Sequence, residues 1–95
     1  MLVELKKLNI VNEGYKRIIS LDKIFVNPNH VISVRDYAGA TEFLLSEGSD
    51  YYSKKKFSLV SINYGKGTEE IIALGSSEDL FLAFQNKTEK RLLND

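Results

Sequence analysis

Apolar and polar residues alternate over short segments that are separated by turn-forming residues, and this pattern predicts a chain made mainly of strands. The first two segments cover residues 2–11 and 15–21 and are joined near Gly14, with β-branched residues on both sides. This arrangement favours a β-hairpin over a helix. The apolar side of the first segment changes at Lys6 and Lys7, which a β-bulge would explain.

The clearest turn in the chain is Asn27-Pro28-Asn29. Proline fixes its own φ and restricts the residue before it, while asparagine tolerates turn conformations. The β-branched segment 30–37 that follows predicts a strand. We expect residues 38–56 to form a loop insertion, within which residues 41–45 are compatible with either a strand or a helical turn.

A second hairpin and one helix complete the pattern. Residues 57–64 and 68–74 alternate on either side of the glycine-rich turn 65–67. Ser76 is well placed to cap a helix, because acidic residues follow it in the first helical turn and apolar residues then recur at helical spacing. We expect this helix to pack on the sheet and residues 87–95 to extend it or to fray.

The predicted elements specify an α+β, β-rich fold: a small antiparallel sheet with one C-terminal helix, for which an SH3-like partial barrel is one candidate form. A chain of 95 residues fits a single domain, residues 1–95. A domain of this size buries roughly 60 to 65% of the surface that its unfolded chain exposes, enough for one core.

The segment 24–34, followed by a hairpin and a capped acidic helix at 76–80, resembles the short FlbD-like β-rich proteins of flagellar operons and similar short bacterial and phage reading frames. The resemblance covers about residues 23–84 and rests on a turn and a helix cap. It implies this fold and the role of a small accessory protein, such as one encoded by a phage. It implies no activity that could be carried over to particular residues.

Composition narrows the possible chemistry. The chain has no cysteine, which excludes a disulfide scaffold, a thiolate nucleophile and a zinc site built on cysteine. No apolar stretch reaches the roughly 18 residues of a membrane span, and no secretory signal is expected near the start. We therefore expect a cytoplasmic protein that does not enter a membrane.

The single histidine, His30, is a candidate base or pH-sensitive polar contact because imidazole titrates near neutrality. No nucleophile or second histidine accompanies it by spacing, so a locally bonded or solvated turn residue is the stronger interpretation. Glu69 and Glu70 point to opposite faces of a strand, and helix capping accounts for Glu78 and Asp79. We expect no catalytic constellation, no bound metal and no cofactor.

The most suggestive polar segment for a ligand contains Tyr51, Tyr52, Lys54, Lys55 and Lys56. Aromatic rings stack on unpaired bases and lysines neutralise phosphates, so the segment is a candidate site for single-stranded nucleic acid or a nucleotide-like anion. The balance of 13 basic and 13 acidic residues weighs against this, because nucleic-acid-binding domains usually carry a basic excess.

A non-enzymatic binding or regulatory module is the leading hypothesis. We expect it to contact a protein partner, and to form homo-oligomers, through a strand edge of the 57–74 hairpin and through the 38–56 segment. Binding of nucleic acid through residues 51–56 is the alternative.

Overall fold

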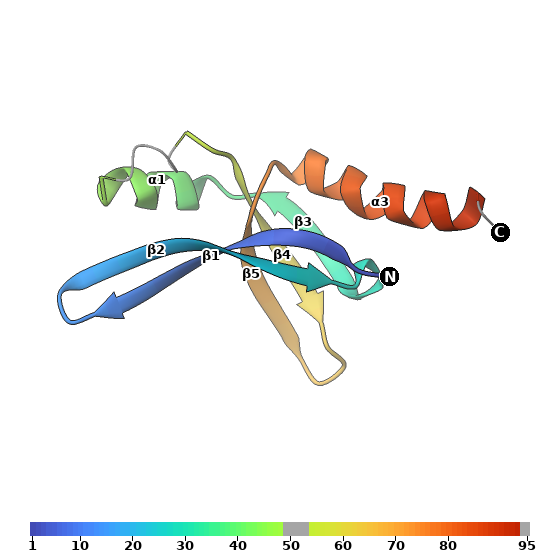
Figure 1. Ribbon diagram of the computed structural model, residues 1–95, viewed down its shortest axis with the longest axis horizontal. Coiled ribbons are helices and arrows are strands. Elements are labelled where there is room, and N and C mark those ends of the chain that lie inside the picture. Colours follow the sequence, from blue (N-terminus) through green and yellow to red (C-terminus); the bar gives the residue numbers. More distant parts are fainter. Residues whose placement is uncertain (49–53, 94–95) are drawn as a thin grey trace.

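Five antiparallel strands form one sheet in the spatial order β2-β1-β5-β4-β3 (Figure 1). The computed structural model describes residues 1–48 and 54–93, with side chains as far as residue 85. The strands are β1 (Val3–Glu13), β2 (Lys16–Val26), β3 (Val31–Asp36), β4 (Phe57–Asn63) and β5 (Thr68–Leu74). The helices are α1 (Ala38–Ser46), α3 (Ser77–Leu93) and the short 3-10 helix η1 (Pro28–His30).

The sheet is open, with β2 and β3 as its two edges. β1 pairs with β2, β3 with β4 and β4 with β5, each antiparallel. The two hairpin regions are joined where Lys7 of β1 lies opposite Ala73 of β5. The predicted β-rich antiparallel fold with a C-terminal helix is confirmed. The narrower comparison with an SH3-like barrel stays a prediction.

The β1–β2 hairpin is long and regular. Its register is constant from Val3 opposite Val26 to Glu13 opposite Lys16, so the bulge expected at Lys6 and Lys7 is wrong. Gly14, with a positive φ of 63°, forms the two-residue turn. The irregularity in the sheet lies instead in β3, between Val31 and Ser33.

The two helices bury two separate cores, which lie on opposite faces of β4 and β5. In Figure 1, α1 and α3 lie over opposite ends of the β1–β2 hairpin. Under α3 lie alternate residues of the strands, including Val60 and Ile62 of β4. Under α1 lie the intervening residues, including Phe57. β1 supplies Val3 and Leu5 to the first core and Leu8 to the second, because it crosses from one helix to the other. This crossing is the reason that its apolar side changes.

Residues 41–45 are helical, so much of the expected 38–56 insertion is the helix α1 and not a loop. Ala40 and Leu44 are four residues apart and both are buried against Phe57, which explains why helix replaces strand here. At the other end of the chain, the helical backbone of α3 continues to Leu93. The fraying expected of residues 87–95 stays a prediction.

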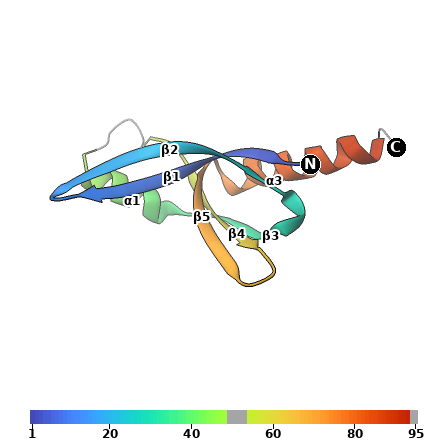
Figure 2. The ribbon, with the colours of Figure 1, turned by 60° about the horizontal axis from the view of Figure 1, so that its bottom comes forward.

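The 57–74 hairpin offers a free edge on one of its two strands. β4 lies between β3 and β5 and is paired on both sides. β5 pairs with β4 along its whole length but with β1 only where Lys7 lies opposite Ala73, so its outer edge from Thr68 to Ile72 has no ladder partner among the described residues. The far end of this hairpin projects from the body of the molecule (Figure 2). Contact through an edge of the hairpin stays a prediction, beside the edge strands β2 and β3.

Candidate functional site

A groove of about 460 Å³ runs between the edge strand β3 and the helix α3. One side is formed by the four consecutive residues Val31, Ile32, Ser33 and Val34, and the other by Phe81 and Phe84. Val31 and Val34 pack on the core under α3, whereas Ser33 lies opposite Ser61 on the other face, and Ile32 lies at the register shift between Val31 and Ser33. The lining thus takes residues from both faces of this edge strand, so the groove lies along the free edge of β3.

The groove is mainly apolar, with Ser77 and Glu78 at one end. Val31 and Val34 are half-buried and pack on the α3 core, and Phe84 is buried. Ile32 and Phe81 remain 57% and 56% exposed. Large apolar side chains that stay exposed on both sides of a groove are typical of a surface that binds another molecule.

The hydrogen-bond pattern identifies which backbone groups of β3 face outward. The N–H of Tyr37 donates to the carbonyl of Phe57 (2.9 Å), which continues the β3–β4 register. Inward and outward groups alternate along an antiparallel strand. Val34 and Asp36 therefore direct their N–H and C=O groups away from β4, toward the free edge.

Two contacts fix the start of α3 beside this edge. The Oγ of Ser76 accepts from the N–H of Asp79 (3.1 Å), which is the predicted helix cap. The N–H of Ser77 donates to Oδ1 of Asp36, at the end of β3 (2.8 Å). The second bond ties the first turn of α3 to the end of β3, close to one end of the groove.

The glycine before this cap ties the helix to β4. The N–H of Gly75 donates to the carbonyl of Lys56 (2.7 Å), and the buried Ser58 hydroxyl donates to the Gly75 carbonyl (2.8 Å). Gly75 has a φ of 123°, and a Cβ atom there would lie 3.4 Å from Leu80. A positive φ of this size favours glycine over other residues.

The carboxylate of Asp36 has a lowered pKa, chiefly because it accepts the backbone hydrogen bond of Ser77. The Ser77 side chain lowers this pKa further, desolvation opposes these two effects, and the nearby Lys56 adds a still smaller lowering. No local sequence pattern predicts this contact, since Asp36 and Ser77 are 41 positions apart.

A second cleft, of about 410 Å³, adjoins the groove at Ser77 and Glu78, which line both. It extends past Asp36 and Lys56 to Tyr37 and Thr41 at the start of α1. Its lining mixes cations, anions and hydroxyls. The groove beside β3, by contrast, is lined mainly by apolar side chains.

The residues predicted to bind nucleic acid are only partly described. Lys54, Lys55 and Lys56 are exposed, and Lys56 lines the second cleft, whereas Tyr51 and Tyr52 lie outside the described residues. Nucleic-acid or anion binding by this segment stays a prediction.

His30 ends η1 and is exposed, and it lines a shallow hollow together with Asn63 and Tyr64. The turn around it is stabilised locally, because Oδ1 of Asn27 accepts from the N–H of Asn29 (2.9 Å). No cluster of three or more metal-ligating His, Cys, Asp or Glu side chains occurs within residues 1–48 and 54–85. In the same part of the chain, none of the helices combines the length and apolar character needed to cross a membrane.

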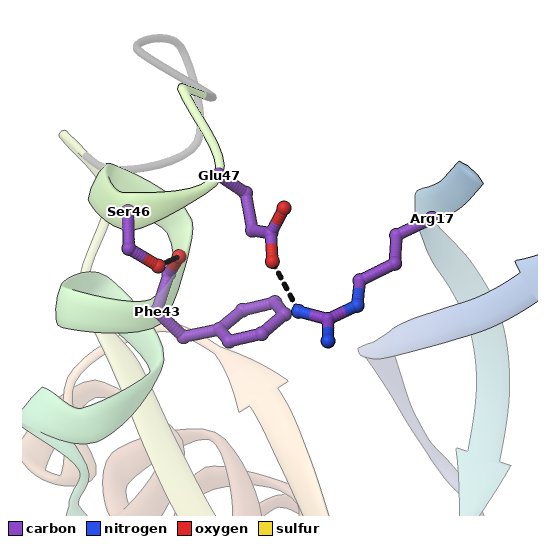
Figure 3. A network of polar contacts seen from close by, with 4 residues as sticks. All are labelled: Arg17, Phe43, Ser46 and Glu47. Atoms are coloured by element: carbon purple, nitrogen blue, oxygen red, sulfur yellow. Dashed lines mark hydrogen bonds and ion pairs between the residues drawn. The ribbon is translucent and has the colours of Figure 1, made fainter. Parts of the chain in front are cut away.

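A polar network joins the hairpin tip to the end of α1 (Figure 3). Arg17 of β2 forms an ion pair with Glu47 and lies over the ring of Phe43, 5.6 Å from its centroid. This arginine is therefore engaged in holding α1 against the hairpin.

Comparison with known proteins gives no relative: no family model, no curated protein and no solved structure matches this chain. The FlbD-like resemblance, the phage accessory role and the cytoplasmic location stay predictions. The functional hypothesis therefore depends on the geometry of the groove.

Proposed function

We propose that this chain is a protein-binding module that takes an extended segment of a partner polypeptide as an added strand on β3. The observation that carries the proposal is the free edge of β3, which borders an apolar groove closed on its other side by α3. In this mode of recognition, backbone hydrogen bonds supply affinity and pockets for alternate side chains supply specificity.

Both requirements have a counterpart in the groove. The outward backbone groups of Val34 and Asp36 are available to an incoming strand. Every second side chain of that strand would enter the groove and cover Phe81, which is largely exposed in the unbound chain. Covering the edge would also remove the unpaired backbone groups that make exposed strand edges prone to aggregation.

The test begins with selection of random dodecapeptides, displayed on phage, against the immobilised wild-type protein. Selected peptides are then titrated into ¹⁵N-labelled protein. We expect the largest amide shifts at Val34, Asp36 and the facing turn of α3. Shifts that map to a different surface, or a selection that yields no binding peptide, would overturn the proposal.

Two substitutions of the same residue type separate the groove from general surface stickiness. Phe81→Ser removes the exposed wall of the groove and should weaken binding of the selected peptides at least ten-fold, because Phe81 would be buried by the ligand. Phe25→Ser is the matched control, since Phe25 is 59% exposed on β2 and does not line the groove. Equal losses in the two variants would contradict the groove as the binding site.

A further inference from the structure

The β3 edge carries charged side chains at fixed positions beside the apolar groove. We propose that these charges select an antiparallel partner segment in which an acidic residue directly precedes the apolar residue that enters the groove. This inference rests on the proposed function above and specifies the chemistry of the partner.

The position of the apolar residue follows from the pairing of an added strand. A residue opposite Val34 lies on the same face of the sheet as Val34, which is the face covered by α3. Its side chain would contact Val34 below and Phe81 at the side. An apolar side chain suits this position because the lining there offers no charge.

The choice of an acidic residue is explained by the next pair along β3, which involves Arg35. Arg35 lies opposite Leu59 of β4, whose neighbour Ile72 packs toward α1, so Arg35 is on the other face of the sheet. Arg35 is exposed, and no carboxylate of the described residues lies within ion-pair distance of it. Directly opposite residues of unlike charge stabilise a strand pair, so an acidic residue is favoured opposite Arg35.

The third pair, with Asp36, restricts the partner residue that lies next to the acidic residue. A residue opposite Asp36 returns to the α3 face, near Asp36 itself and Glu78, which lines that end of the groove. Lys56 lies near Asp36, whereas Glu78 has no ion-pair partner among the residues described. A second acidic residue is therefore disfavoured at this position.

Strand direction converts these three positions into a sequence. Antiparallel pairs are slightly more stable per residue than parallel ones, and β3 already pairs antiparallel with β4. In an antiparallel partner the residue opposite Asp36 comes first, the one opposite Arg35 second and the one opposite Val34 third. The favoured order is a non-acidic residue, then Asp or Glu, then an apolar residue.

The test uses fluorescein-labelled peptides and fluorescence anisotropy with the full chain. The first probe is Ser-Lys-Glu-Val-Thr-Val-Ser, the second has Lys in place of its Glu, and the third is the first sequence reversed. We expect wild type to prefer the first probe over the second by about two- to five-fold, the range for an opposite-charge pair across strands. The reversed probe should bind more weakly than the first.

Charge reversal in the protein provides the decisive comparison. Arg35→Glu should invert the preference, so that the second probe binds more tightly than the first. Lys66→Glu is the matched control, because it makes the same change of charge on an exposed residue in the β4–β5 turn and should leave the preference unchanged.

The outcomes separate this inference from the proposed function. Equal binding of the first two probes by wild type, with loss of both in Phe81→Ser, would overturn the charge selection and leave the groove as the binding site. Tighter binding of the reversed probe would overturn the antiparallel order. If none of the probes bound, the sequence preference would be wrong, and the display selection alone would then decide whether the groove binds peptides.

Discussion

At the scale of single residues, Asp36 connects the sheet to the helix that forms the groove. Its carboxylate accepts the N–H of Ser77, one of the backbone donors that the first turn of a helix leaves without an internal partner. A negative charge at this end of a helix is also favoured by the helix dipole. Asp36 therefore supports the position of α3 while its backbone stays available at the strand edge.

The lowered pKa of Asp36 predicts a pH dependence of stability. Because the folded-state pKa lies below the unfolded value, the stabilisation is present above the unfolded pKa and is lost as pH falls through the folded pKa. Asp36→Asn should therefore lower the urea midpoint of unfolding at pH 7, and the difference from wild type should shrink toward pH 3. Glu42→Gln, on the exposed side of α1, is the control. A difference that stays constant over this pH range would contradict the assigned role.

The Ser76 cap predicts a loss of stability that a different capping residue restores. Ser76→Ala should lower the free energy of unfolding by about 1 kcal/mol, because it removes the acceptor for the N–H of Asp79. Ser76→Asp keeps an acceptor at the same place and should remain near wild type. Urea unfolding of both variants measures the effect, and equal stability of Ser76→Ala and wild type would show that the cap is dispensable.

These two residues show how far sequence reasoning reaches at this scale. The Ser76 cap follows from spacing alone, since the acceptor and its donor are three residues apart. The contact of Asp36 depends on how β3 and α3 meet in space, and no local pattern encodes it. The same is true of Ile32 and Phe81, whose exposure follows from the edge position of β3.

At the scale of elements, α1 is held by tertiary packing more than by its own signals. Its N-cap residue, Tyr37, makes no side-chain capping bond. Ala40 and Leu44 anchor it to the second core, and Arg17 holds its far end through Glu47 (Figure 3). The short apolar run 41–45 is compatible with either helix or strand by pattern alone, so only the docking surface decides its structure.

Neighbouring leucines on α1 provide a test of this docking. Leu44 is fully buried, whereas Leu45 is 59% exposed. Leu44→Ala should lower the free energy of unfolding by about 2 to 5 kcal/mol, because it opens a cavity in the second core. Leu45→Ala should change it by less than about 0.5 kcal/mol. Equal effects in chemical denaturation would show that the segment does not dock as described.

At the scale of the whole molecule, the two outer strands of the sheet differ in character. β2 is long and carries the charged residues Lys16, Arg17 and Lys23, a feature that protects edge strands from pairing with one another. β3 is short and borders the apolar groove. The alternating pattern established that the chain is β-rich, but which strands lie at the edges depends on the pairing of β5 with β1.

Self-association through β3 is expected at high protein concentration, since a second copy offers the same free edge. Light scattering after size exclusion should give a mass that rises above that of the monomer with concentration. Ile32→Lys, which places a charge on the edge, should return the mass to that of the monomer. Leu45→Lys is the control, because Leu45 is similarly exposed on the far side of the sheet. A wild-type chain that is monomeric at every concentration would contradict the homo-oligomers expected from the sequence.

The passage of β1 from one core to the other has a thermodynamic consequence. Val3 and Leu5 belong to the core under α3, and Leu8 belongs to the core under α1. Neither helix can lose its support without disturbing a strand that the other requires, so the two halves should melt as one cooperative unit. Calorimetric and van't Hoff enthalpies of unfolding should then agree. In hydrogen–deuterium exchange, the most protected amides under the two helices should exchange at the same limiting rate.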